Sequence, residues 1–136
     1  MSELDAAYRR IVGDDAQRSA LITDPAQSDN PVVFASQGFY RLTGYDPDEV
    51  IGGNCRMLQG ADTDPQAVAE IREAIAARRP ITRDILNYRK DGTPFWNRLR
   101  IRPVDDPQSG GERFVGVQNE IAPGEVRDAP IYDIVD

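Results

Sequence analysis

A single thiol is the side chain of this sequence best suited to covalent chemistry. Cys55 stands between Asn54 and Arg56 within the run 52–61, and the chain contains no histidine. A reactive cysteine needs a base or a strongly cationic environment, because the thiolate is the nucleophile. Without an imidazole, chemistry at Cys55 has to be driven by a molecule bound beside it. The sequence therefore predicts a cofactor site.

Other reactive sites are disfavoured by the residue types present. A cysteine hydrolase or transferase needs a thiol-activating base, and a zinc site needs several cysteine or histidine ligands. Asp62, Asp64 and Glu73 have the spacing of a calcium loop. Ala67 stands where such a loop requires glycine, however, and Pro65 is a helix-starting residue. The sequence predicts no metal site.

Composition and charge limit the partners of the chain. The 136 residues are 40% hydrophobic and 29% charged, which is typical of one soluble domain. The formal charge of −7 argues against binding to nucleic acid or to an anionic membrane. No apolar run is long enough to cross a bilayer, and the first residues do not resemble a signal peptide. Because one cysteine cannot form an internal disulfide, we expect a reducing, cytoplasmic location.

The hydrophobic pattern divides the chain into three regions. Residues 1–19 carry apolar side chains at helical spacing and predict an amphipathic N-terminal cap. Residues 20–121 form the domain. Residues 122–136 are acidic and contain proline and glycine, which predicts a flexible or surface-docked tail.

Inside the domain, strands are followed by short helices and then by longer strands, an α+β order. Ser36 predicts the start of one helix, which Gly44 ends. Further helices are predicted to begin at Asp46-Pro47 and at Asp64-Pro65, the last of them running down to Arg79. The five predicted strands are 20–23, 32–35, 81–90, 93–104 and 112–121, the third and fourth joined by a turn at Asp91-Gly92.

Strand parity places three amides on the predicted inner face of the sheet. Asn87, Asn97 and Gln118 lie there among apolar neighbours, because side chains alternate between faces. A buried amide without a partner costs about 1–3 kcal/mol, so all three need partners. They either bond to one another and to the backbone, or bind the polar edge of a flat heterocycle.

Two arginines lie close to the same region. Arg56 follows the cysteine, and Arg72 lies beside the apolar stripe of the long predicted helix. A pair of arginines at the rim of a pocket binds phosphate well. The alternative is that each is a surface residue paired with a local acid such as Glu70 or Glu73.

Longer motifs are distributed over residues 20–121. They are Gly-x-Asn-Cys-Arg-x-Leu-Gln at 52–59, Ile-Arg-x-Ala at 71–74, Asn-Tyr-Arg-Lys-Asp-Gly-Thr-Pro-Phe-Trp-Asn at 87–97 and Phe-Val-Gly-Val-Gln at 114–118. With these motifs the domain resembles the LOV domain, the flavin-binding, blue-light-sensing branch of the PAS fold. The resemblance implies a five-stranded antiparallel sheet with short helices on one face that form a flavin pocket. Met57 departs from the pattern, because the family usually has phenylalanine there.

The resemblance also implies a cofactor and a mechanism. Flavin mononucleotide (FMN) is expected in the pocket, and blue light is expected to join the Cys55 sulfur reversibly to ring carbon C4a while N5 gains a proton. Gln118 is expected to face O4 and N5 and to rotate its amide when N5 becomes a donor. The other expected FMN-binding residues are Thr23, Asn54, Arg56, Leu58, Gln59, Arg72, Ile85, Asn87, Asn97, Leu99, Ile101, Phe114 and Gly116.

The predicted outer face of the sheet carries more apolar side chains than a solvated face does. They are Leu86, Tyr88, Trp96, Val115 and Val117. The N-terminal helix, the acidic tail or a second copy of the chain is expected to cover them. The resemblance implies a homodimer through this face and the flanking segments, together with an unidentified downstream protein partner.

The sequence shows no output segment beside the sensor, so we expect no enzymatic activity of this chain. It resembles a short LOV protein or a sensor module of a longer receptor. Two other functions stay open from the sequence. One is a flavin-based redox sensor that uses the same pocket without photochemistry, and the other is a plain PAS dimerisation module.

Overall fold

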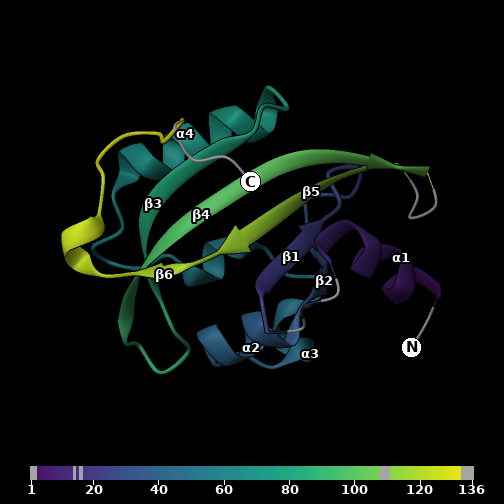
Figure 1. Ribbon diagram of the computed structural model, residues 1–136, viewed down its shortest axis with the longest axis horizontal. Helices are drawn as coiled ribbons and strands as arrows, with labels where there is room; N and C mark the ends of the chain where they lie inside the picture. Colours follow the sequence, from purple (N-terminus) through teal and green to yellow (C-terminus); the bar gives the residue numbers. More distant parts are fainter. Residues whose placement is uncertain (1–2, 14, 16, 108–110, 133–136) are drawn as a thin grey trace.

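An antiparallel sheet forms the centre of the fold in the computed structural model, which describes residues 3–13, 15, 17–107 and 111–132 (Figure 1). Its strands are β1 (Ser19–Thr23), β2 (Val32–Ala35), β3 (Ile81–Tyr88), β4 (Pro94–Asp106), β5 (Gly111–Gln118) and β6 (Glu120–Ile121). The order is β2-β1-β5-β4-β3, and β6 pairs with β4. The helices are α1 (Glu3–Val12), α2 (Gln37–Thr43), α3 (Pro47–Val50), α4 (Pro65–Ala76) and the 3₁₀ helices η1 (Cys55–Leu58) and η3 (Pro123–Glu125). The predicted α+β fold, an antiparallel sheet with short helices, is confirmed.

The helices begin where the capping residues predict. The Ser36 side chain accepts a hydrogen bond from the Phe39 backbone N–H, and Gly44 ends α2 with a left-handed φ of 79°. The Asp64 carboxylate caps α4 in the same way. The predicted end of α4 at residue 79 is wrong by three residues. Arg78 adopts a left-handed φ of 54°, which breaks the helix after Ala76.

The predicted strand 112–121 is divided into β5 and β6 at Asn119. Both pieces keep one register along β4, with Val117 opposite Arg100 and Glu120 opposite Asn97. The Asn119 backbone N–H donates to the Asn97 side chain instead of joining the ladder. The sheet therefore has five strands in its main path and a sixth, two-residue strand beside them.

The N-terminal helix covers part of the outer face of the sheet. Tyr8 and Val12 of α1 are buried in one cluster with Ile22, Val115 and Val117, and Figure 1 shows α1 beside β1 and β5. The expectation that this apolar surface is covered is thus confirmed for its β1–β5 half. Burial of this kind stabilises a fold by about 25 cal/mol per Å² of apolar surface.

Tyr88, which was expected on the outer face, is covered by the loop that precedes α4. Its ring lies so close to Gly60 that a side chain at residue 60 would collide with it, and its hydroxyl accepts a hydrogen bond from the Asp62 backbone N–H. The loop before α4 therefore wraps around the end of β3 and covers this side chain.

The C-terminal segment docks along the exposed edge of β3. The Arg127 backbone N–H donates to the Asp84 carboxylate at 2.9 Å, and the Ile131 N–H donates to the Thr82 carbonyl at 2.8 Å. Ile131 is buried, and Figure 1 shows this yellow segment turning back from β6 toward α4. The described part of the tail is therefore surface-docked. None of the helices in the described ranges is long and apolar enough to cross a membrane.

The Asp84–Arg98 ion pair ties the sheet to this tail, and we predict its contribution to stability. The Asp84 side chain is 0% exposed and accepts bonds from Arg98 Nε at 2.8 Å and Nη2 at 2.9 Å. Asp84→Ala should lower the free energy of unfolding by about 3 kcal/mol, because it leaves a half-buried guanidinium without its carboxylate. Chemical denaturation followed by circular dichroism measures this loss.

The exposed pair Arg78–Glu112 provides the control, since Glu112→Ala should cost under about 1 kcal/mol. Burial opposes ionisation of Asp84, but the hydrogen bonds from Arg98 and Arg127 outweigh it and lower the pKa of this carboxyl. Its stabilisation is therefore present at neutral pH and is lost on acidification below about pH 3.9, where parent and variant should converge. Equal effects of the two substitutions at pH 7 would contradict this assignment.

Candidate functional site

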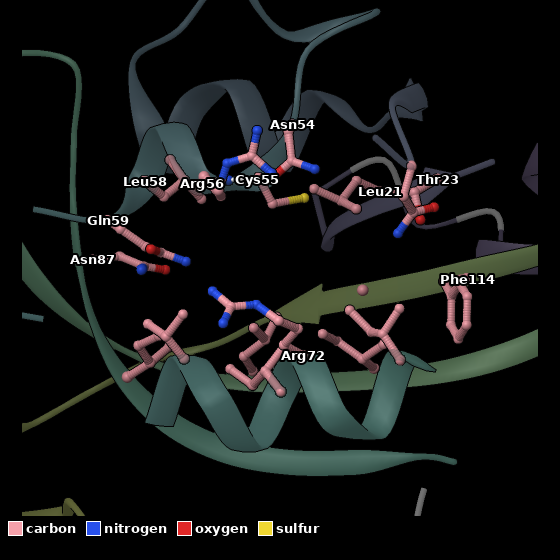
Figure 2. A pocket seen from close by; sticks show the side chains of 18 of the residues that line it. Leu21, Thr23, Asn54, Cys55, Arg56, Leu58, Gln59, Arg72, Asn87 and Phe114 are labelled. Carbon is pink, nitrogen blue, oxygen red and sulfur yellow. Dashed lines mark hydrogen bonds between the residues drawn. The ribbon is translucent and has the colours of Figure 1, made fainter. Parts of the chain in front are cut away.

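A cavity of about 380 Å³ lies between the inner face of the sheet, α4 and η1. Its volume is within the range of about 300–1,000 Å³ that small-molecule sites occupy. The described residues that line it are Leu21, Thr23, Pro25, Gln27, Asp29, Asn30, Asn54, Cys55, Arg56, Leu58, Gln59, Val68, Ile71, Arg72, Ile75, Ile85, Asn87, Asn97, Leu99, Ile101, Phe114, Gly116 and Gln118. Figure 2 shows this space between η1 above and α4 below, with Arg72 extending into it from α4 and Cys55 directed into it from η1.

Every site residue named from the sequence lines this one cavity. The lining residues that were not named as site residues belong to two groups. Val68, Ile71 and Ile75 form the apolar stripe of α4. The sequence showed their helical spacing, but it did not show that they face a cavity. Leu21 precedes Thr23 on β1, and Pro25, Gln27, Asp29 and Asn30 belong to the β1–β2 loop, where no periodicity marks which side chains turn inward.

Asn54 sets the position of the thiol. Its side-chain oxygen caps η1 by accepting from the Arg56 N–H at 2.9 Å, and its amide nitrogen donates to the Asp29 carbonyl at 2.7 Å. These bonds fix both ends of the peptide that carries Cys55. The residue as a whole is half-buried, while its sulfur lies inside, and Figure 2 shows this sulfur directed into the cavity.

Burial keeps this thiol neutral. It raises the pKa of Cys55 from 9.0 to about 11, and neither a backbone hydrogen bond nor the nearby Arg56 guanidinium, which both favour the thiolate, offsets it. At neutral pH the group is therefore a thiol and not a thiolate. The site therefore lacks the thiolate that a cysteine hydrolase requires.

Asn87 and Asn97 form a polar strip on the inner face. Asn97 Nδ2 donates to Asn87 Oδ1 at 3.0 Å, and Asn97 Oδ1 accepts from the Asn119 backbone N–H. Bonding between the amides, one of the two alternatives from the sequence, is thus present. Each amide has two N–H donors and two acceptor lone pairs, so these contacts leave capacity for a ligand edge.

Gln118 lies at the other end of the strip. Its Oε1 accepts from the Ser19 hydroxyl at 2.7 Å, which joins β5 to the first residue of β1. A Cβ at Gly116 would lie 3.5 Å from Gln118 Nε2, so the glycine keeps the space beside this amide open. The Nε2 group is the part of Gln118 that is available to a molecule in the cavity.

Two buried polar atoms of the lining have no hydrogen-bond partner among the residues that the structure describes. They are Thr23 Oγ1 and Asn30 Oδ1, at the β1–β2 end of the cavity. An orphaned buried polar atom costs about 1–3 kcal/mol, and such atoms are satisfied by a ligand or water. Hydroxyl groups would suit both.

The arginines expected at a phosphate lie on opposite sides of the cavity. Arg72 is exposed on α4, and Figure 2 shows it extending toward the centre. Arg56 instead pairs with Asp29 through two hydrogen bonds of 2.8 and 2.6 Å. The acid that pairs with Arg56 is therefore in the β1–β2 loop and not on α4, where a local partner was expected.

Comparisons with known proteins agree on one family. The PAS domain family matches residues 19–122. A structure from a study of a flavin analogue in the light-oxygen-voltage (LOV) domain superimposes with a TM-score of 0.75 and 46% identity, over 80% of this chain and 81% of that one. The dark structure of the blue-light photoreceptor Aureochrome1 LOV gives a TM-score of 0.75 and 41% identity, over 91% and 86%. The chain is a LOV domain of the PAS family.

Curated relatives of this LOV domain are much longer proteins. The blue-light-activated histidine kinase of Brucella ovis is 52% identical over 101 residues, which are 74% of this chain and 21% of the kinase. Phototropin-2 of Oryza sativa subsp. japonica is 45% identical over 106 residues, 78% of this chain and 12% of the phototropin. The LOV domain thus spans about a fifth or less of the length of either relative.

The raised pKa of Cys55 predicts slow alkylation of this LOV domain. In flavin-free protein at pH 8, iodoacetamide should modify Cys55 about 10- to 100-fold more slowly than it modifies the same cysteine in urea, because the folded chain holds less thiolate. The rate should rise until about pH 11. Mass spectrometry of timed samples measures it, and equal rates in folded and unfolded chains would contradict the neutral thiol.

Proposed function

We propose that this LOV domain is a blue-light photoreceptor that binds FMN and uses Cys55 as a reversible, light-driven nucleophile. The observation that carries the proposal is a neutral thiol directed into a cavity that combines apolar walls with a strip of amides. The relatives support it, because they are named as blue-light-activated or blue-light photoreceptor proteins.

The walls of the cavity suit a flat aromatic ring. Ile85, Leu99 and Ile101 rise from the sheet, and Val68 and Ile71 face them from α4. Asn87 and Asn97 would bind the polar edge of the ring with their remaining donor and acceptor positions. Leu58 and Phe114 would complete the apolar contacts. The apolar walls and the strip of amides would therefore both fit a flavin ring.

The rest of FMN would extend toward the β1–β2 loop and the arginines. Thr23 and Asn30 offer unsatisfied polar atoms to the ribityl hydroxyls, and Asn54 and Gln59 lie beside them in the lining. Arg56 and Arg72 would share the phosphate, because guanidinium groups bind phosphate oxygens through paired N–H donors.

When bound, the excited flavin supplies an electrophilic carbon, C4a, beside a proton-accepting nitrogen, N5. Cys55 would supply both the sulfur for that carbon and the proton for that nitrogen. The electron pair of the S–H bond would form the S–C bond, the π pair between the carbon and the nitrogen would take up the proton, and no outside base would be needed. The reverse transfer in the dark would return the proton to Sγ, which would account for reaction of a buried thiol in a chain without histidine.

Gln118 would carry the change out of the cavity. In the structure its Oε1 accepts from Ser19, and its Nε2 is the group left for the ligand. When the facing nitrogen becomes a donor, Gln118 has to offer Oε1 to it, and the Ser19 hydroxyl then loses its acceptor. Ser19 begins β1, directly after the segment that joins β1 to α1.

Signal output is proposed to pass through the flanking regions 1–19 and 122–136 around the core domain 20–121. Both flanks touch the sheet, since α1 covers Val115 and Val117 and the tail bonds to β3. We propose that light changes their packing and thereby a homodimer or a contact with a downstream protein. The chain itself is proposed to have no enzymatic turnover, the output activity belonging to that partner.

Replacement of the relay amide tests the output route. Gln118→Leu should still bleach under blue light, because Cys55 is unchanged, but it should lose most of the light-induced increase in hydrogen exchange of residues 3–13. Hydrogen exchange with mass spectrometry, dark against lit, measures this. A full light response of α1 in the variant would exclude Gln118 as the relay.

Replacement of the thiol tests the photochemistry. Cys55→Ala should keep a flavin absorption band and lose the reversible bleaching, because the ring contacts remain while the nucleophile is gone. Absorption spectra before and after a blue flash measure this, with Met57→Leu as a neighbouring control that should still bleach.

The other functions left open by the sequence give different outcomes. A flavin band that fails to bleach in the parent protein, with Cys55 reacting only toward oxidants, would establish the redox sensor. A parent protein that takes up no flavin would leave the PAS dimerisation module.

A further inference from the structure

One acid shares the end of the cavity where the phosphate of FMN is expected. The Asp29 carboxylate binds Arg56 bidentately, Oδ1 to Nη1 at 2.8 Å and Oδ2 to Nη2 at 2.6 Å. The two side chains are 56% and 59% exposed, so the pair lies at the mouth of the cavity and not inside its wall. The hydrogen bond from Arg56 lowers the pKa of Asp29, which is therefore ionised at neutral pH.

The Asp29–Arg56 pair lowers the net positive charge of the cavity lining that would face a phosphate. Among the described residues that line the cavity, the charged ones are Asp29, Arg56 and Arg72. Their formal charges sum to +1, whereas a phosphate monoester carries about −1.5 to −2 at pH 7. Two arginines alone would neutralise the phosphate, but the carboxylate cancels one of them.

We propose that Asp29 is a specificity-determining residue, whose carboxylate occupies the phosphate-binding face of Arg56 and so weakens discrimination between FMN and the uncharged riboflavin. The proposal rests on the proposed flavin function. It assigns to the site a ligand class, flavins with or without the terminal phosphate, that two unopposed arginines would not accept equally.

A phosphate could bind Arg56 in two ways, and the Asp29 carboxylate makes both of them less favourable. A guanidinium has five N–H donors, of which this pair uses two. If the phosphate takes the other three, the carboxylate remains beside a dianion. If the phosphate displaces the carboxylate, the bidentate pair is lost first. Riboflavin avoids both costs, because it brings no charge to the mouth.

Asparagine is a suitable replacement for testing this. Asp29 has a left-handed φ of 68°, a conformation that asparagine adopts more readily than most residues. The bond that Asp29 makes to the Asn54 side chain uses its backbone carbonyl and is kept in the variant. Asp29→Asn therefore removes one negative charge and leaves the loop and the Cys55 segment in place.

The experiment titrates the flavin-free full chain with FMN and, separately, with riboflavin, following the quenching of flavin fluorescence. Asp29→Asn should bind FMN about 5- to 10-fold more tightly and riboflavin with unchanged affinity, as expected for removing a charge several ångström from a dianion in a solvated site. The gain should shrink as salt is added, because the pair is exposed. Asp48→Asn makes the same charge change on α3, outside the cavity lining, and should alter neither affinity.

The outcomes separate this proposal from the function on which it rests. Unchanged riboflavin binding shows that the variant is folded. Equal FMN affinity in parent and Asp29→Asn, or an equal gain for both flavins, would overturn the role of Asp29 while leaving flavin binding intact. A parent chain that binds neither flavin would overturn the proposed function itself. The flavins released from the purified parent, separated by chromatography, should include riboflavin beside FMN, and FMN alone would count against the proposal.

Discussion

The structure depends on an inner sheet face that its own side chains do not fill. A domain of this size normally places its main core there. Here the described apolar residues gather in one cluster under α1 and in another between β1, α2, α3 and η1. The region between the sheet and α4 is a cavity instead. Stability therefore has to come from these two clusters, from the ion pair of Asp84 with Arg98, and from any ligand, which stabilises the folded state by mass action.

The same burial explains the chemistry of the thiol. Desolvation that favours an apolar ring also disfavours a thiolate, so Cys55 is held neutral where a hydrolase would have it ionised. In the proposed function, light-driven proton transfer to a bound ring would remove this barrier without a histidine. Asn87, Asn97 and Gln118 serve the fold and the site together, because their partly used amides bind one another, the backbone or Ser19 and keep donors toward the cavity.

The site residues could be predicted from the sequence in two ways, by strand alternation for the three amides and by the family resemblance for the others. Strand alternation placed Asn87, Asn97 and Gln118 on one face, and the motif around Cys55 identified the family. Capping residues such as Ser36 gave the helix starts. Periodicity says nothing, however, about partners far apart in the chain. The pairing of Arg56 with Asp29, and the docking of the tail on Asp84, depend on loop conformations that no local pattern encodes. The division of β5 from β6 was missed for a similar reason, since a side chain takes the Asn119 N–H.

The S–H stretching band of Cys55 in a light-minus-dark infrared difference spectrum of the purified protein is the measurement to make first. If the buried thiol is neutral in the dark and bonds to the flavin under blue light, this band disappears on illumination and returns in the dark together with the flavin absorption. An S–H band that persists while the flavin bleaches would show that the thiol does not react, and it would contradict the role assigned to Cys55.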